Sequence, residues 1–201
     1  MLVGKKVNLR ALELSDLDNN MMWINDREVT RWLVSFTWPT SRKTEEQWLI
    51  NRLTSPSPTD RVLVIETKDG TYLGNIGLHG IDYISGVAEL GIVIGRKDQW
   101  GKGYGSDAIR TLLDFAFREL RLRKIFLRVL GNNIRAQKCY SKIGFKEAGR
   151  LKAHQLRDGN FEDLIYMEIF AEEFLALNGS TEDAHATGEN RGSEDSPTGR
   201  T

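Results

Sequence analysis

The chain has 201 residues, which is long enough for one domain with a full hydrophobic core. Its 28 basic residues equal its 28 acidic residues, which argues against a nucleic-acid or membrane partner. Cys139 is its single cysteine, so no internal disulfide can form, and the N-terminal MLVGKKVNLR is not an apolar signal segment. We therefore expect a soluble, cytoplasmic protein.

The first half of the chain predicts helices between strands. Alternating apolar and polar residues at its start indicate a strand. Ser15, with Asp18 three residues later, is typical of a capping box that begins a helix, and Ser41 is a typical N-cap. The predicted elements are strands over 6–11, 61–67, 72–79 and 87–94, and helices over 15–23, 27–33 and 42–53.

The second half alternates helices with strands and ends in a strand pair. Apolar residues at helical spacing predict a helix that begins at Asp107, and Gly144 is expected to end a later helix as its C-cap. The predicted elements are helices over 107–120 and 134–143, and strands over 124–130, 146–155 and 160–170. This order predicts an α/β fold, in which a mixed sheet carries helices on both faces.

The composition changes at residue 178. From there NGSTEDAHATGENRGSEDSPTGRT has no aromatic residue, no aliphatic residue larger than alanine, and an excess of acidic residues. Such a segment cannot bury enough apolar surface to offset the entropy that is lost on ordering. We therefore predict one domain over residues 1–177 and a disordered, polar, acidic tail over residues 178–201.

A strand, a glycine-rich loop and a helix follow one another over residues 87–106, VAELGIVIGRKDQWGKGYGS. The apolar, β-branched residues 87–94 indicate a strand that is buried on both faces. Gly101, Gly103 and Gly105 let backbone N–H groups approach a bulky ligand, and the helix start adds unpaired donors and partial positive charge. The pattern predicts a pyrophosphate site, although a tight strand-to-helix connection would use the same glycines.

Two well-known phosphate loops do not match this pattern. A Walker A loop needs Gly, four residues and then Gly-Lys-Ser/Thr, and the chain has no such stretch. The dinucleotide fingerprint needs G-x-G-x-x-G and an acidic residue at the end of the next strand. Here the spacing is G-x-G-x-G, and the next strand runs into Leu130 and Gly131.

The loop resembles the acyl-CoA loop of the GNAT superfamily, the acetyl-CoA-dependent N-acetyltransferases, whose pattern is Arg/Gln-x-x-Gly-x-Gly/Ala. Trp100 stands in the first position of that pattern. Downstream, Asn132, Ala136 and Tyr140, followed by KIGF at 142–145, are similar to the family's Asn…Ala…Tyr-x-Lys-x-Gly-Phe segment. The resemblance extends to the branch of ribosomal-protein Ala/Ser N-acetyltransferases and spermidine N-acetyltransferases. That narrower similarity is carried by residues 8–12, 23–26, 100–104 and 157–163.

The resemblance implies the GNAT (acyl-CoA N-acyltransferase) fold, with a mixed, mostly antiparallel sheet, and acetyl-CoA as the acetyl donor. It implies that the pantetheine arm pairs with the backbone of Ile92, Val93 and Ile94, where Gly91 suits a close backbone approach. The implied loop contacts are Trp100, Gly101, Lys102, Gly103, Tyr104, Gly105 and Ser106, with Asn132 on the other side of the cofactor. No His, Cys and Asp residues have metal-ligand spacing, so no metal is expected.

Two residues are candidates for the chemistry. A neutral aliphatic amine, with a pKa of about 10.4, costs roughly 4–5 kcal/mol at pH 7. Glu89 is the candidate base, directly or through a water, and the alternative is a carboxylate paired with an arginine. Tyr140 matches the family's tyrosine that protonates the CoA thiolate, and the alternative is a packing role. Cys139 has no predicted His partner and is expected to be a small buried residue.

The sequence does not identify the acceptor amine. Trp32, in the irregular stretch 32–38, and His79, at a strand end, are candidate acceptor contacts. The resemblance implies direct transfer in a ternary complex, to a protein N-terminal Ala or Ser amine, a polyamine or another small amine. It leaves a homodimer open. The alternative is a non-catalytic module that binds acetyl-CoA as a sensor or scaffold.

Overall fold

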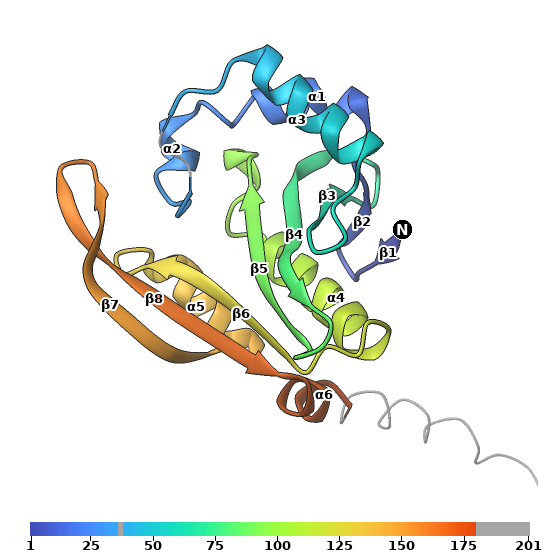
Figure 1. Cartoon of the computed structure of the whole chain (residues 1–201), viewed down its shortest axis with the longest axis vertical. Coiled ribbons are helices and arrows are strands. Elements are labelled where there is room, and N and C mark those ends of the chain that lie inside the picture. Colours follow the sequence, from blue (N-terminus) through green and yellow to red (C-terminus); the bar gives the residue numbers. More distant parts are fainter. Residues whose placement is uncertain (36–37, 180–201) are drawn as a thin grey trace, which may run out of the picture.

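The computed structural model describes residues 1–35 and 38–179, which form an 8-stranded sheet with the order β1-β2-β3-β4-β5-β6-β8-β7 (Figure 1). The strands are β1 (Leu2–Val3), β2 (Val7–Ala11), β3 (Arg61–Thr67), β4 (Tyr72–Asp82), β5 (Val87–Ile94), β6 (Lys124–Leu130), β7 (Lys146–Arg157) and β8 (Asn160–Phe170). The helices are α1 (Leu17–Met21), α2 (Arg27–Thr30), α3 (Arg42–Thr54), α4 (Tyr104–Arg118), α5 (Ile134–Ile143) and α6 (Ala171–Gly179), with the 3-10 turns η1 (Leu14–Asp16) and η2 (Lys97–Gln99).

The sheet is interrupted between β5 and β6. The other neighbouring strands pair antiparallel, whereas β5 and β6 are parallel and pair only from Val87–Lys124 to Glu89–Phe126. Beyond Glu89 the two strands diverge, and Figure 1 shows β4 and β5 turning away from β6 and β8. The β6-facing backbone of residues 90–94 therefore has no partner among the described strands.

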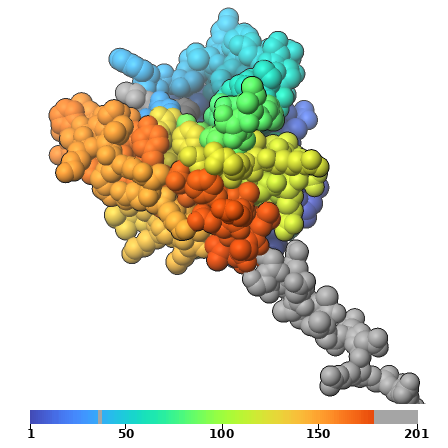
Figure 2. Space-filling view, turned by 60° about the horizontal axis from the view of Figure 1, so that its bottom comes forward, coloured from blue at the N-terminus to red at the C-terminus, as the bar shows by residue number. Residues whose placement is uncertain are grey.

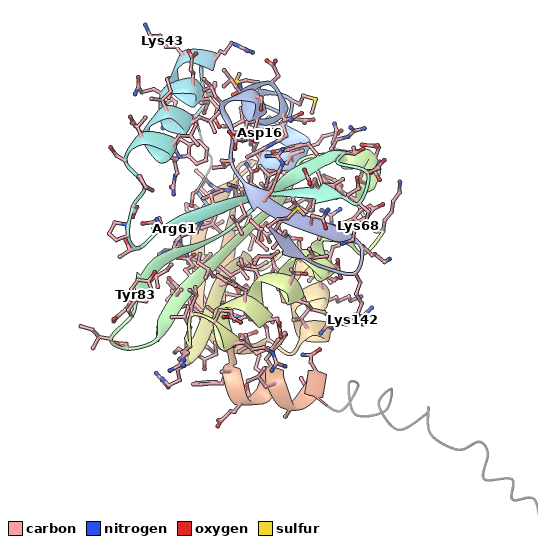
Figure 3. All side chains as sticks on the ribbon, turned by 90° about the vertical axis from the view of Figure 1, so that its right-hand side faces the viewer. Asp16, Lys43, Arg61, Lys68, Tyr83 and Lys142 are labelled. Atoms are coloured by element: carbon pink, nitrogen blue, oxygen red, sulfur yellow. The ribbon has the colours of Figure 1, made fainter. Side chains whose placement is uncertain are left out.

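Two hydrophobic cores lie on opposite faces of the sheet, which confirms the predicted layering. Val64 belongs to the core under α1, α2 and α3, while its neighbour Ile65 belongs to the core under α4 and α5. Consecutive strand residues point to opposite faces. Figure 3 separates the two helical groups, with Lys43 on α3 at the top of the view and Lys142 on α5 in its lower half.

Most of the predicted elements are confirmed by the structure. The bounds over 61–67, 87–94, 124–130, 134–143 and 160–170 are as predicted. Ser41 caps α3 by accepting a hydrogen bond from the Thr44 N–H at 3.1 Å, and Gly144 ends α5 in the left-handed conformation, with φ 119°. The sequence pattern predicted neither β1 nor α6, which are short and carry weak periodicity.

Three local predictions are wrong. The first capping box joins Glu13 and Asp16 rather than Ser15 and Asp18, because Asp16 is held in place by an ion pair with Arg10. The predicted helix over 27–33 ends at Thr30. Strand β5 is not buried on both faces: only Ala88 and Leu90 are fully buried, and residues 91–94 are half-buried along the cavities described below.

The predicted tail begins inside α6, because this helix continues to Gly179. The rest of the predicted tail, 180–201, lies outside the described residues. Figure 2 shows the β7–β8 hairpin and α6 forming one flank of the molecule. Within 1–35 and 38–179, no helix combines the length and the apolar character that crossing a membrane requires.

An ion-pair network ties η1 to the first strands. The guanidinium of Arg10 donates two hydrogen bonds to Asp16, at 2.7 and 2.8 Å, and one to Glu66 on β3, at 2.7 Å. Asp16 is almost completely buried. Burial by itself raises the pKa of Asp16, but hydrogen bonds from Arg10 and the Glu13 N–H outweigh it and lower the pKa below its ordinary value. The network therefore fixes the segment that leads into α1.

We expect Asp16→Ala to lower the free energy of unfolding by about 3 kcal/mol at pH 7, because it leaves the Arg10 guanidinium without its buried partner. Asp18→Ala is the matched control, since Asp18 is an exposed partner of Arg42 and should change stability by no more than about 0.5 kcal/mol. Urea unfolding measures both variants. Equal effects of the two substitutions would contradict the prediction.

The same network gives a pH dependence with a defined sign. A carboxyl whose folded-state pKa is lowered stabilises the protein above the unfolded-state pKa, which for Asp is about 3.9. That contribution is lost as the pH falls through the lower folded-state value. The stability difference between the wild type and Asp16→Ala should therefore be constant above about pH 5 and shrink below about pH 4.

Candidate active site

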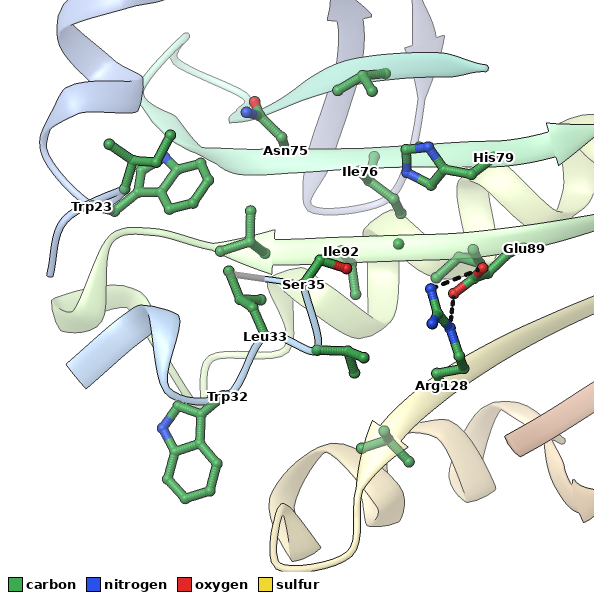
Figure 4. Close-up of a pocket in the computed structure, with 18 of the residues that line it drawn as sticks. Trp23, Trp32, Leu33, Ser35, Asn75, Ile76, His79, Glu89, Ile92 and Arg128 are labelled. Carbon is green, nitrogen blue, oxygen red and sulfur yellow. Dashed lines mark hydrogen bonds and ion pairs between the residues drawn. The ribbon is translucent and has the colours of Figure 1, made fainter. Parts of the chain in front are cut away.

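The divergence of β5 and β6 is accompanied by two adjoining cavities. The tryptophan cavity, of about 540 Å³, lies between α3, β4, β5 and β6 and is lined by Trp23, Trp32 and Trp48. Figure 4 shows Trp23 and Trp32 around it. The glycine-loop cavity, of about 430 Å³, lies between β5, α4 and α5 and includes the loop from Gln99 into α4. The residues that line both are Trp32, Leu33, Ile92, Val93, Asn133 and Tyr140.

The unpaired edge of β5 leads from the first cavity to the second. Ile92 and Val93 line both cavities, and Ile94 lines the glycine-loop cavity. These are the residues that the family resemblance assigns to the pantetheine amides. Backbone N–H and C=O groups need partners when they are buried, so an extended ligand with amide groups can take the place of a neighbouring strand here.

The glycine loop and the start of α4 form an arrangement of free donors. Gly101 and Gly103 adopt the left-handed conformation, with φ 77° and 85°. Helix α4 begins at Tyr104, three residues before the predicted start, and its first backbone bond runs from the Asp107 N–H to the Gly103 carbonyl at 3.1 Å. Gly103 provides no side-chain cap, so the N–H groups of residues 104–106 have no intrahelical partner. An anion is stabilised at such a helix start.

Contacts with the N-terminal strands hold this helix start. The carboxylate of Asp107 accepts hydrogen bonds from the backbone N–H groups of Lys6, at 2.7 Å, and Val7, at 3.0 Å. Lys6 Nζ donates to the Lys102 carbonyl at 2.9 Å. Lys102 itself donates to Gln99 and lines a third, separate cavity instead of the glycine-loop cavity.

Trp100, which departs from the family's Arg or Gln, closes the loop onto β5. Its Nε1 donates to the Ile94 carbonyl at 2.8 Å. The guanidinium carbon of Arg135, on α5, lies 4.2 Å from the centre of the indole ring, which is cation–π geometry. Arg135 also lines the glycine-loop cavity. The tryptophan thus fixes the loop and positions a guanidinium beside the cavity.

The two consecutive asparagines after β6 have different environments. Asn132 is exposed and lines neither of the two cavities. Asn133 is buried, caps α5 by accepting from the Ala136 N–H at 3.2 Å, and lines both cavities. Asn133, and not Asn132, is therefore the asparagine that faces the two cavities.

Tyr140 lies where the two cavities meet. It is half-buried on α5, and its ring packs against Phe145 with the ring centres 6.0 Å apart. Burial raises the pKa of the Tyr140 phenol well above its ordinary value, with the neighbouring Cys139 acting in the same direction and Arg135 opposing. The hydroxyl therefore stays protonated at neutral pH and is able to donate a proton.

Glu89 is paired with an arginine. Arg128, on β6, donates from Nε to one carboxylate oxygen of Glu89 at 2.6 Å and from a terminal nitrogen to the other at 3.2 Å (Figure 4). Glu89 is the last residue of β5 that pairs with β6, so this ion pair joins the two strands where their backbone pairing ends. Both carboxylate oxygens keep a further lone pair for a ligand. The paired carboxylate that the sequence left as an alternative is thus the observed arrangement.

The structure brings nearly all of the predicted residues to the two cavities. Trp32 lines both, and His79 lines the tryptophan cavity opposite Glu89 in the β4–β5 register. Lys102 and Asn132 are the exceptions. Cys139 is half-buried, with its Sγ 3.1 Å from the Ser106 Oγ. Within the described part of the chain, no group of His, Cys, Asp and Glu residues is suited to hold a metal ion.

Several residues of the tryptophan cavity were not predicted. Arg128 left a signal, as the charged residue in the middle of the apolar strand KIFLRVL. Glu45 left none: it is buried on α3, accepts from Asn20 Nδ2 at 2.8 Å, and has its pKa raised by burial. Arg52 also lines the cavity, and one of its terminal nitrogens is buried without a hydrogen-bond partner in the described residues.

Known proteins with similar sequences indicate the family to which this chain belongs. A family model described as an acetyltransferase (GNAT) domain matches residues 6–146. The spermidine N(1)-acetyltransferase of Vibrio cholerae is 30% identical over 173 residues, which cover 86% of this chain and 98% of that protein. An uncharacterized N-acetyltransferase of Bacillus licheniformis, p20, is 29% identical over 175 residues, 86% of this chain and 97% of the relative.

A solved structure is similar as well. The crystal structure of spermidine N-acetyltransferase from Vibrio cholerae in complex with CoA and spermine superposes with a TM-score of 0.77 at 29% identity. The match covers 84% of this chain and 98% of that chain. The chain therefore spans nearly the full length of these proteins.

The glycines of the loop should differ in what they tolerate. We expect Gly103→Ala to weaken acetyl-CoA binding about tenfold, because alanine at φ 85° costs about 1–2 kcal/mol and its Cβ would lie 3.3 Å from Lys6 Nζ. Gly105→Ala should bind almost normally, since its Cβ would meet Ile94 at an ordinary 3.7 Å. Titration calorimetry with acetyl-CoA measures both.

Gly149→Ala on β7 is the control for the substitution itself, because a Cβ there meets nothing within 4 Å. It should leave the affinity for acetyl-CoA unchanged. Wild-type affinity in Gly103→Ala would show that the loop conformation does not set acetyl-CoA binding.

Proposed function

The chain belongs to the GNAT acetyltransferase family and is an acetyl-CoA-dependent N-acetyltransferase, and on this premise we propose that its acceptor is a small primary amine bound in the tryptophan cavity. One observation carries the proposal: the two cavities share Ile92, Val93 and Tyr140. A donor in the glycine-loop cavity and an amine in the tryptophan cavity would therefore meet at one place. The alternative of a non-catalytic sensor or scaffold is not retained, because the comparisons fit an enzyme.

The glycine-loop cavity fits the donor in two respects. The unpaired edge of β5 suits the amides of pantetheine, and the free N–H groups of residues 104–106 suit a pyrophosphate. Acetyl-CoA supplies a thioester carbonyl and a thiolate leaving group. We assign the contacts to Ile92–Ile94, to the loop residues 100–106 other than Lys102, and to Asn133 in place of Asn132.

Tyr140 is proposed to give its proton to the departing thiolate. Its position at the meeting point of the cavities places it beside the reacting groups, and its raised pKa keeps it protonated. A thiol has a pKa of about 8.5, so its thiolate already leaves readily. The contribution of the tyrosine should therefore be moderate, about ten- to a hundredfold.

Glu89 is proposed to bind the acceptor ammonium and not to deprotonate it. The two carboxylate oxygens of Glu89 accept hydrogen bonds from Arg128. If Glu89 took up a proton, it would lose its negative charge, and the guanidinium would be left without a counter-charge. The remaining lone pairs can still accept from an ammonium group. This assignment replaces the role of base that the sequence suggested.

The acceptor is proposed to be a polyamine in the first instance. The support is the similarity to spermidine N-acetyltransferases, including one solved with spermine. Glu45 and Glu89 offer carboxylates within the cavity. Arg52 and Arg128 balance them, however, and a cavity with two guanidinium groups also suits an amine that carries a carbonyl or carboxylate. A peptide N-terminus is therefore the second candidate.

Tyr140→Phe is expected to lower kcat about ten- to a hundredfold and to leave the acetyl-CoA Kd unchanged, because only the hydroxyl is removed. Tyr83→Phe is the control: Tyr83 is an exposed tyrosine in the β4–β5 turn, and its substitution should not alter turnover. Steady-state kinetics and calorimetry give the two quantities. Unchanged turnover in Tyr140→Phe would remove this residue from the mechanism.

Acetyl-CoA-dependent thiol release against a panel of amines identifies the acceptor. The panel contains spermidine, spermine, peptides that begin with Ala or Ser, an amino sugar and an amine-free blank. We expect release above the blank with the polyamines. Release with the peptides alone would favour the second candidate, and no release with any amine, despite acetyl-CoA binding, would contradict the proposed acceptor class.

A further inference from the structure

His79, which lines the tryptophan cavity, forms a hydrogen-bonded pair with Asp60, which is not among the lining residues. His79 Nδ1 lies 3.2 Å from Asp60 Oδ1. The other oxygen of Asp60 accepts from Ser57 Oγ at 3.0 Å and from Thr59 Oγ1 at 3.1 Å. The loop that precedes β3 thus holds one oxygen of the carboxylate, and the other oxygen orients the imidazole.

The imidazole leans along β5 toward the place where the cavities meet. His79 is paired with Glu89 in the β4–β5 register, yet a Cβ on Gly91 would lie 3.0 Å from His79 Nε2 and 3.2 Å from Cδ2. The ring therefore extends over Gly91, the residue that precedes Ile92. Only a residue without a side chain leaves this space, which gives Gly91 a function beyond its backbone.

The hydrogen bonds select one protonation state. Burial by itself raises the pKa of Asp60, but hydrogen bonds from Ser57, His79 and Thr59 outweigh it and lower the pKa below its ordinary value. An ionised carboxylate only accepts, so Nδ1 of His79 carries the proton and donates it to Asp60. The lone pair of a neutral imidazole then lies on Nε2, the nitrogen beside Gly91.

We propose that His79, oriented by Asp60, is the general base that takes a proton from the acceptor ammonium, directly or through a water. This inference rests on the proposed function of the tryptophan cavity. The ammonium N–H bond breaks and its proton goes to Nε2. The freed lone pair forms the C–N bond as the thioester C–S bond breaks.

The remaining protons balance. Tyr140 protonates the thiolate, and the second proton that the nitrogen loses restores Tyr140. The proton on His79 leaves to solvent, which the side chain reaches because it is 37% exposed. Asp60 is a positioning residue, since it acts through the imidazole and stabilises its charged form.

The other charged groups around the imidazole do not displace it from this role. Glu89 faces it from β5 and is bound to Arg128 of β6 through both oxygens. Glu45 and Arg52 lie on the α3 wall of the same cavity. Among these side chains, histidine is the one that most often acts as a general base.

Kinetics against pH test the proposal with the best acceptor from the amine panel. We expect His79→Gln to lower kcat/KM about 10²- to 10⁴-fold and to lose the acidic limb of the wild-type profile. In Asp60→Asn that limb should move, and Gly91→Ala should reduce kcat. Imidazole added to His79→Ala should restore part of the rate. His154→Gln, at an exposed position on β7, is the control and should match the wild type.

The outcomes separate this base from the competing one. An acidic limb that survives in His79→Gln and disappears in Glu89→Gln would overturn the proposal in favour of Glu89. A loss of rate in His79→Gln that is matched by a loss of acetyl-CoA affinity would show a structural role and would also overturn it. Acetyl-CoA titrations on every variant provide that comparison.

A second measurement does not depend on turnover. Nitrogen-15 NMR at alkaline pH, where the imidazole is neutral, should show the proton of His79 on Nδ1 in the wild type. In Asp60→Asn the distribution of this proton between Nδ1 and Nε2 should change. A proton on Nε2 in the wild type would overturn the proposal, because no lone pair would then face the cavity. Absence of turnover on every amine, with the Nδ1–H form observed, would instead count against the proposed acceptor alone.

Discussion

Three residue pairs join β5 to β6, and the site depends on where that pairing stops. Each strand is held on its other side, β5 by β4 and β6 by β8, so neither can move across to close the gap. The gap leaves backbone donors and acceptors of β5 without a strand partner, which a folded protein accepts only where water or a ligand satisfies them. A continuous sheet would be more regular and would have no place for the donor.

The rest of the site follows from what the chain does at the two ends of this gap. After Ile94 the chain turns through η2 and the glycine loop directly into α4, so a free strand edge and a free helix start lie next to each other. After β6 the chain enters α5, whose cap Asn133 and whose Tyr140 come to the same gap from the opposite side. The arrangement thus needs only two strand-to-helix connections.

The sequence predicted those connections well because their signals are local. Strand bounds, the cap at Ser41, the stop at Gly144 and the glycine loop all depend on residues within a few positions of one another. Pairings between distant residues were out of reach. His79 and Asp60 are 19 residues apart, and Glu89 and Arg128 are 39 apart, and no local pattern indicates which partners folding selects. The family resemblance assigned Asn132 to the cofactor, whereas Asn133, one position later, is the asparagine that lines both cavities.

Gly91 shows how one residue can satisfy two demands, of which the sequence reveals only one. A glycine inside a strand indicates a close approach of the backbone, and β5 has a free edge at this point. The structure adds a steric demand from a neighbouring strand, because any Cβ at position 91 would meet the imidazole of His79. Since no left-handed φ is involved, backbone conformation does not require the glycine. The space above Gly91 lets the side chain of His79, on β4, extend across β5. The proposed acceptor cavity therefore depends on Gly91, while the strand edge that suits the donor begins at the next residue, Ile92.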